Sequence, residues 1–286
     1  MSTARDLVLL ARPKGTLLLL AVPLTGYGFA HWDGRLTLTR PIAMAFVLAA
    51  WVLLSAGSLW LNAALDGDEG GALFSADARH PKELTTYGYA ALACAVVLAS
   101  FAGLRPGMAC AICAGMAVLY SHPAVKWKAH PVMGPLVNGA GYGLASFFAG
   151  HAVAAPALTL GSALAMGLLA LFVVGMTFAA QAYQRDDDAR RGYRTLVVTA
   201  GPGACLRVAA WCTRGAIVGV AAGSIAGVYP RLVLFGLPAF VLAEITMARW
   251  RRAPEGGDAR FAASFATRVL AGGAVLVALA TVAALR

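Results

Sequence analysis

Acidic residues are scarce in this chain, and most of them lie in two short polar connections between apolar runs. Eight of the 13 Asp and Glu residues belong to these two clusters. The first cluster comprises Asp66, Asp68, Glu69, Asp77 and Glu83, and the second comprises Asp186, Asp187 and Asp188. In proteins, Mg²⁺ typically takes one or two carboxylates together with phosphate oxygens of a substrate. If the two clusters meet in space, they predict a site for Mg²⁺ and a diphosphate group.

Lys and Arg side chains accompany both acidic clusters. They are Arg79 and Lys82 beside the first, Arg185, Arg190, Arg191 and Arg194 beside the second, and Lys126 and Lys128 in a connection between the two. Cationic side chains form strong, charge-assisted hydrogen bonds with phosphate oxygens. These residues could therefore take the phosphate charge that a metal ion leaves uncompensated.

Asn62 lies four residues before Asp66, near the end of an apolar run. Residues four apart on a helix share one face, so the two side chains would point the same way. A polar group at membrane depth is costly and usually functional. For this cluster alone a structural explanation is equally good, in which Asn62 caps or packs locally and the acids solvate a loop.

The composition predicts that these connections belong to a membrane protein. Hydrophobic residues make up 60% of the 286 residues and charged residues only 13%, with a mean hydropathy of +0.73. Soluble domains carry about 25% charged residues, and a spanning helix needs about 20 apolar residues. Apolar runs cover residues 15–31, 41–65, 86–104, 106–120, 131–154, 157–182, 203–227, 230–248 and 263–285. We therefore predict an all-α, polytopic transmembrane bundle of about nine helices that forms a single domain over residues 1–286.

The distribution of basic residues predicts the orientation of the bundle. With the N-terminus inside, the inner connections hold 15 Lys and Arg residues and the outer ones hold 5. Cytoplasmic loops are usually enriched in Lys and Arg. We expect a multi-pass protein of a bacterial or archaeal type of plasma membrane, with the N-terminus and both acidic clusters cytoplasmic. The same asymmetry accounts for the net charge of +10 without nucleic acid as a partner.

Several motifs along almost the whole chain resemble those of the UbiA-type intramembrane prenyltransferase family. They are Ala11-Arg12-Pro13, Asn62-Ala-Ala-Leu-Asp66, Tyr120-Ser-His-Pro123 followed by Lys126 and Lys128, and Asp188-Ala-Arg-Arg-Gly-Tyr-Arg-Thr195-Leu. The resemblance implies a UbiA-like bundle with both acidic motifs at the cytoplasmic side. Two positions depart from the family pattern, because Gly70 and Gln184 stand where the family has aspartates. Neighbouring acids could substitute, and the number of metal ions depends on whether they do.

The resemblance further implies that the protein transfers an isoprenyl group from an allylic prenyl diphosphate, with Mg²⁺ as cofactor. The acceptor would be a small, aromatic or lipid-like molecule. The implied catalytic residues are Asn62, Asp66, Lys126 and Asp188. The implied metal ligands are Asp66, Asp68, Glu69, Gln184, Asp187 and Asp188. The implied diphosphate-binding residues are Arg12, Tyr120, Lys126, Lys128, Arg190 and Arg194.

Three cationic or aromatic residues also have structural explanations. Lys128 could equally anchor a helix at the lipid headgroups, and Tyr120 could belong to an interfacial aromatic belt. We interpret Arg191 as a charge that sets topology. The sequence leaves these explanations open beside the functional ones.

Two other functions are compatible with the sequence. UbiA-type terpene cyclases ionise the same donor but quench the resulting cation internally, and the altered acidic positions leave this reaction open. The second alternative is a transporter or a non-catalytic membrane protein. Transporters often have internal repeats and charges at the bilayer midplane. Here no convincing repeat is evident and the acids lie at the ends of the runs, although Arg214 could lie deeper.

Overall fold

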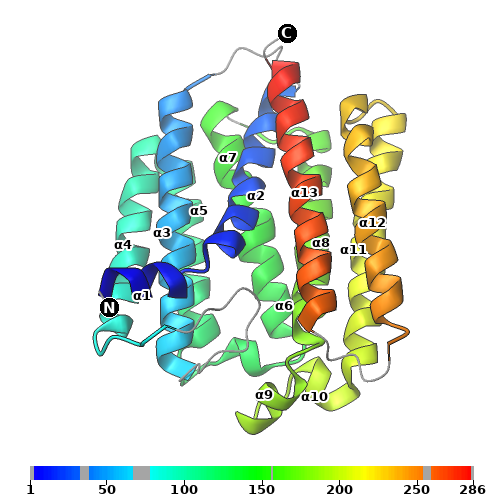
Figure 1. The fold of residues 1–286 in the computed structure, drawn as a ribbon. Coiled ribbons are helices and arrows are strands. Elements are labelled where there is room, and N and C mark those ends of the chain that lie inside the picture. The colour runs from blue at the N-terminus through cyan, green and yellow to red at the C-terminus, as the bar shows by residue number, and fades with distance from the viewer. Residues whose placement is uncertain (1–2, 33–38, 67–77, 156, 254–258, 285–286) are drawn as a thin grey trace.

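The computed structural model describes residues 3–32, 39–66, 78–155, 157–253 and 259–284, and every regular element in this part of the chain is helical. The long helices are α2 (Pro13–Trp32), α3 (Pro41–Asp66), α4 (Leu84–Ala102), α5 (Leu104–Ser121), α8 (Leu160–Gln181), α11 (Pro202–Ile225), α12 (Leu237–Trp250) and α13 (Ala259–Ala284). The shorter elements are α1 (Thr3–Leu10), η1 (Trp127–Ala129), α6 (Met133–Asn138), η2 (Gly139–Ala145), α7 (Ser146–Ala154), α9 (Arg185–Arg190), α10 (Leu196–Ala200) and η3 (Arg231–Gly236). The long helices run side by side, and α9 and α10 lie together at one end of the bundle (Figure 1).

Each of the nine predicted apolar runs is mostly helical where the structure describes it, although the run 86–104 breaks at Gly103 between α4 and α5. The run 131–154 is divided among α6, η2 and α7, and the run 230–248 is divided between η3 and α12. Among the described residues, six helices are long and apolar enough to cross a membrane, and α1 with α2, bent by 57°, would make a seventh. The chain is therefore a multi-pass integral membrane protein, as the sequence predicts.

Two large apolar cores occupy the two halves of the bundle, and a third, smaller cluster of Val22, Phe147, Ala165 and Tyr229 joins α2, α7 and α8. The first joins α2, α3, α4, α5 and α7 around buried residues such as Trp51 and Leu54. The second joins α8, α11, α12 and α13 around buried residues such as Leu206, Trp250 and Phe265. The halves are connected where α2 packs on α13 and where α8 packs on η2. This arrangement leaves room for a cavity between the two cores.

Close packing between η2 and α8 depends on a residue without a side chain. A Cβ atom added at Gly143 would lie only 2.5 Å from the Cα atom of Ala170. Small residues permit such close approach between helices in lipid, where packing replaces the hydrophobic effect as the driving force. Gly143 thus allows α8 to lie directly against the neighbouring span.

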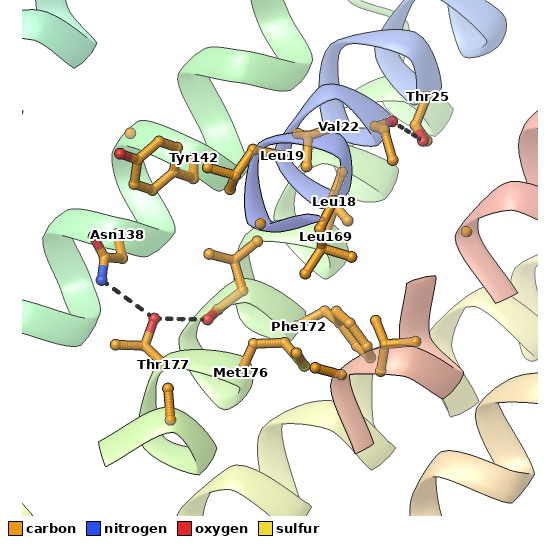
Figure 2. Close-up of a pocket in the computed structure, with 18 of the residues that line it drawn as sticks. Leu18, Leu19, Val22, Thr25, Asn138, Tyr142, Leu169, Phe172, Met176 and Thr177 are labelled. Carbon is orange, nitrogen blue, oxygen red and sulfur yellow. Dashed lines mark hydrogen bonds between the residues drawn. The ribbon is translucent and has the colours of Figure 1, made fainter. Parts of the chain in front are cut away.

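The same element, η2, is a π-helical segment within an otherwise α-helical span. The carbonyl of Gly141 accepts the backbone N–H of Ser146, five residues on, and also a hydrogen bond from Ser146 Oγ at 2.9 Å. Segments of this kind occur frequently at functional sites, because they redirect side chains within a helix. Here Tyr142, within η2, and Asn138, directly before it, line the central cavity (Figure 2).

Three connections converge at the end of the bundle that carries α9 and α10. The end of α3 meets η1 through an ion pair between Asp66 and Lys128. The α9–α10 connection meets η1 where the backbone N–H of Arg194 donates to the carbonyl of Ala129 at 2.9 Å. The three polar segments, the first and last of which are more than a hundred residues apart in the sequence, are therefore neighbours in space.

Candidate active site at the polar end of the bundle

The first acidic cluster contributes Asp66, the last residue of α3, and its neighbour on the same helix face, Asn62. Lys128 Nζ lies 2.5 Å from Asp66 Oδ1 and donates a hydrogen bond to Asn62 Oδ1 at 2.8 Å. The hydroxyl of Ser121, at the end of α5, donates to the same amide oxygen at 3.3 Å. The predicted sharing of one face by Asn62 and Asp66 is confirmed, since one lysine contacts both.

The second cluster contributes Asp188, which is buried in α9. Its Oδ2 atom accepts a hydrogen bond from Thr195 Oγ1 at 2.6 Å, and its carbonyl accepts the backbone N–H of Tyr193 at 2.9 Å. The hydroxyl of Tyr193 donates to Asp66 Oδ1 at 2.6 Å. The tyrosine therefore links the two acidic clusters directly.

Burial strengthens the electrostatic interactions at this end. The side chains of Lys128 and Asp66 are only 5% and 2% exposed, and Arg191 lies 3.9 Å from Asp66 Oδ2. Desolvation lowers the pKa of Lys128, although the adjacent Asp66 carboxylate opposes that shift. Desolvation also raises the pKa of Asp188, against the hydrogen bond from Thr195 and the charge of Arg191. The charged form of each of these buried groups is therefore stabilised by its ion-pair and hydrogen-bond partners.

One cavity of about 860 Å³ begins at these groups and continues between the two cores. Its polar end is lined by Asn62, Asp66, Lys128, Asp188 and Arg191, among others. Further along, the lining is apolar: Figure 2 shows Leu19 and Val22 of α2 and Leu169 and Phe172 of α8 pointing toward one another. The cavity thus combines a charged end with a long apolar interior, which suits an amphiphile with an anionic head.

Most of the residues predicted for the site lie at this cavity, but some do not. Of the predicted residues that the structure describes, those that line the cavity are Arg12, Asn62, Asp66, Tyr120, Lys128, Gln184, Asp187 and Asp188. Asp68 and Glu69, like Gly70, lie outside the described residues. Three predicted cations do not line the cavity: Lys126, Arg190 and Arg194.

The three cations away from the cavity have identifiable surroundings. Arg190 is 77% exposed and pairs with Asp187, one turn earlier on α9. Arg194 is exposed, and Lys126 lies 5.7 Å over the ring of Tyr193. Lys126 and Arg190 therefore lie at the rim of the site, while Lys128 and Arg191 reach its interior.

Four residues at the site were given no functional role from the sequence. Tyr193 and Thr195 donate hydrogen bonds to Asp66 and Asp188, and Ser121 donates one to the amide oxygen of Asn62. Gln181, the last residue of α8, lines the cavity three residues before Gln184. The available signal was that Ser121, Tyr193 and Thr195 stand within the motifs and that Gln181 is an amide within an apolar run. Arg191, interpreted as a topology charge, also reaches Asp66.

The donor set fits a divalent cation whose coordination is completed by a substrate. Asp66 and Asp188 line the same cavity end, together with Gln184 and Asp187. Within the described residues no three His, Cys, Asp or Glu side chains form a metal-binding group. Mg²⁺ needs only one or two carboxylates, because it retains waters and binds phosphate oxygens. The chemistry of this end therefore suits Mg²⁺ better than a structural zinc ion, which takes four protein ligands.

These features define a class of protein, an intramembrane helical bundle whose buried charged site opens into an apolar cavity. The chain belongs to the UbiA prenyltransferase family, whose sequence model matches residues 18–269. The protein is accordingly an enzyme of that family. A comparison with curated protein sequences found no match.

Solved structures of similar fold cover nearly the whole chain. A UbiA homolog from Archaeoglobus fulgidus bound to DMAPP and Mg²⁺ is 17% identical with a TM-score of 0.70, covering 96% of this chain and 99% of that one. The same homolog bound to GPP and Mg²⁺ gives 16% identity and a TM-score of 0.69, covering 98% and 100%. A structure concerning digeranylgeranylglyceryl phosphate synthase in membranes gives 16% identity and a TM-score of 0.64, covering 99% of each chain. At these identities the likeness establishes the UbiA-like fold.

Proposed function

We propose that this protein transfers an isoprenyl group from an allylic prenyl diphosphate to a small acceptor, using Mg²⁺, inside the membrane. One observation carries the proposal: Tyr193 joins Asp66 of the first acidic cluster to the segment that carries Asp188, at the charged end of one apolar cavity. The A. fulgidus homolog binds DMAPP or GPP with Mg²⁺, and these ligands have the same combination of anionic head and apolar tail.

Asp66 and Asp188 would hold Mg²⁺, with Asp187 and Gln184 nearby and Asp68 and Glu69 as further candidates. When bound, the ion neutralises charge on the leaving diphosphate. Two carboxylates would be held in place for this purpose by neighbouring hydrogen bonds, from Tyr193 to Asp66 and from Thr195 to Asp188. Fixed ligands of this kind need no reorganisation when the ion binds.

Lys128 and Arg191 are the cations best placed to bind the diphosphate, with Arg12 and Tyr120 bordering the same space. Negative charge grows on the diphosphate as the bond from carbon to oxygen breaks. Positive groups in a buried, low-dielectric site stabilise that charge more strongly than they would in water. Lys126, Arg190 and Arg194 would act at the rim, where they raise the local concentration of an anionic substrate.

The apolar cavity would hold the isoprenyl tail and protect the allylic carbon from water. Loss of diphosphate leaves a cation that water would capture, so a dry surrounding is needed for transfer. Leu19, Val22, Leu169 and Phe172 supply such a surrounding (Figure 2). The acceptor would be aromatic or lipid-like, and the likeness to digeranylgeranylglyceryl phosphate synthase makes a lipid-like acceptor a candidate. By the distribution of basic residues, this site would face the cytoplasm.

The proposal is tested by mass spectrometry of products from purified protein given Mg²⁺, donors from geranyl to geranylgeranyl diphosphate, and pooled acceptors. We expect prenylated product with the native chain and a loss of at least about 100-fold in Asp66→Asn and Asp188→Asn, because each removes a charged ligand. Asp186→Asn is the matched control, since that side chain is exposed and does not line the cavity. Full activity in the two site variants would refute the proposal. A cyclic hydrocarbon formed without acceptor would instead favour a terpene cyclase.

A further inference from the structure

Gln181 is a buried amide that the proposed chemistry does not yet use. It is 6% exposed, it lines the cavity, and its Oε1 atom has no hydrogen-bond partner among the described residues. A buried polar atom without a partner is unusual, because burial removes its bonds to water without replacing them. Such an atom in a substrate cavity indicates a partner that arrives with the substrate.

The position of Gln181 on α8 places it between the two ends of the cavity. Thr177 lies one turn before it and Gln184 one turn after it, and all three line the cavity. Thr177 accepts a hydrogen bond from Asn138 Nδ2 at 3.4 Å at the edge of the apolar interior (Figure 2). Gln184 stands four residues before Asp188, which lines the charged end of the cavity. Gln181 therefore lies between the apolar interior and the charged end, where the isoprenyl tail of the proposed donor would meet its diphosphate.

The chemistry of an amide oxygen restricts what can bind it. Oε1 is an acceptor, so its partner must supply an O–H or N–H group or a cation. An isoprenyl tail offers neither, and the oxygens of an ionised diphosphate are themselves acceptors. Of the two substrates, this leaves the molecule that receives the isoprenyl group. Mg²⁺, the cation of the proposed reaction, is the alternative partner, and the experiment below distinguishes the two. No charged residue occurs in α8, and Thr177 and Asn138 are neutral as well, so this wall of the cavity favours an uncharged molecule.

We propose that Gln181 Oε1 accepts a hydrogen bond from a hydroxyl group of an uncharged acceptor substrate, and that Asn138 and Thr177 border the same subsite. This inference rests on the proposed prenyl transfer and adds the class of acceptor and the residue that selects it. Gln181 stays neutral throughout and takes no proton. It orients the acceptor against the allylic carbon, and a cavity with a buried polar group rejects analogues that leave this group unpaired.

The test compares the native protein with Gln181→Leu, using hydroquinone, 1-naphthol and their methyl ethers as acceptors. We expect the KM for the hydroxylated acceptors to rise about tenfold or more in Gln181→Leu, since one hydrogen bond in a buried site is lost. The native protein should prefer each hydroxylated acceptor to its methyl ether, and the variant should lose that preference. The KM for the prenyl diphosphate and the Mg²⁺ dependence should stay as in the native protein.

Two further measurements keep the outcomes distinct. Gln184→Leu carries the same change one turn closer to the acids, and we expect it to alter the Mg²⁺ or donor dependence instead. Gln181→Asn retains the amide and tests whether a shorter group restores part of the preference when Gln181→Leu is poorly folded. This inference alone would be overturned if active Gln181→Leu kept the native acceptor KM and the native preference for hydroxylated acceptors over their methyl ethers. It would also be overturned if the substitution changed only the Mg²⁺ dependence of activity. Absence of diphosphate release by the native protein from every donor would overturn the proposed function and this inference with it.

Discussion

At the scale of single residues, the burial of Lys128 distinguishes between the two roles that its sequence context allows. Its sequence context allows a helix anchor at the headgroups as readily as a ligand for phosphate. In the structure its side chain is 5% exposed and contacts both Asp66 and Asn62. A buried lysine is retained only if its charge is paired, because desolvation otherwise removes the proton. The anchor explanation is therefore wrong, since an anchor would place the ammonium group in the headgroup region.

Replacement of Lys128 by Met should weaken both the fold and substrate binding. The change leaves Asp66 buried without its nearest cation, and breaking a buried ion pair costs roughly 3–5 kcal/mol. We expect a lower Tm and a donor KM raised about tenfold or more, measured by thermal unfolding in detergent and by steady-state kinetics. Lys82→Met is the control, because Lys82 is exposed. Equal Tm and KM values in the two variants would contradict the role that we assign to Lys128.

At the same scale, Arg190 and Arg191 differ although they are adjacent. Residues three apart on a helix share a face, so Arg191 lies on the same side as Asp188, and it reaches Asp66. Arg190 points outward and pairs with Asp187. The sequence contains this three-residue spacing, but the spacing places Arg191 beside Asp188 only if the segment is helical, which the structure shows.

At the scale of elements, η2 and α8 form the wall against which the substrate would lie. Their contact requires a glycine, because any side chain at Gly143 collides with the backbone of Ala170. Gly143 belongs to the π-helical segment η2, which also carries the cavity-lining Tyr142, and Asn138 lines the cavity from the position directly before η2. The glycine spacing in the sequence predicts close helix contact, whereas nothing in it distinguishes a π segment from a regular helix.

Gly143→Ala should separate these two elements and lower stability. The added methyl group would have to push α8 away, and overpacking of this kind costs about 1–3 kcal/mol. Thermal unfolding in detergent should show a lower Tm, with reduced activity because the cavity wall moves. Gly167→Ala in α8 is the matched control, since a Cβ at that position meets nothing within 4 Å. If Gly143→Ala is as stable as Gly167→Ala, the close packing described here is not required.

At the scale of the whole molecule, the cavity depends on two separate cores that face each other. Arg12 and His31, at the two ends of α2, both line it, and 19 residues of helix correspond to about 28 Å. Helix α2 belongs to the first core and packs on α13 of the second. The length available to an isoprenyl tail is therefore set by how the halves of the bundle meet.

Val22→Phe should shorten the usable part of the cavity. Val22 lies ten residues beyond Arg12, about 15 Å along the helix, and points into the apolar interior (Figure 2). We expect kcat/KM to fall more for geranylgeranyl than for geranyl diphosphate, because only the longer tail needs the space beyond Val22. Val218→Phe makes the same change on an exposed face of α11. It should leave unchanged the ratio of kcat/KM for geranylgeranyl diphosphate to kcat/KM for geranyl diphosphate. A ratio that is equal in both variants would exclude this path for the tail.

The sequence by itself determined that this protein lies in a lipid membrane and that its segments are helical. Long apolar runs of this length satisfy their backbone polar groups as helices in lipid, and the two acidic clusters at the ends of such runs, each with cations beside it, predicted a site there. Local spacing also predicted that Asn62 and Asp66 share one helix face, since one helix carries both. These conclusions depend on interactions within a few turns of chain.

Only the tertiary structure decided which distant groups meet. Tyr193 reaches Asp66 across 127 residues, Lys128 reaches Asn62 across 66, and Asn138 lies beside Thr177 across 39. These contacts depend on how the connections turn, as at Lys126 with its left-handed φ of 44°, and on which helix faces pack together. Side-chain spacing encodes the face of one helix, but the rotation of one helix against another follows from packing of the whole bundle.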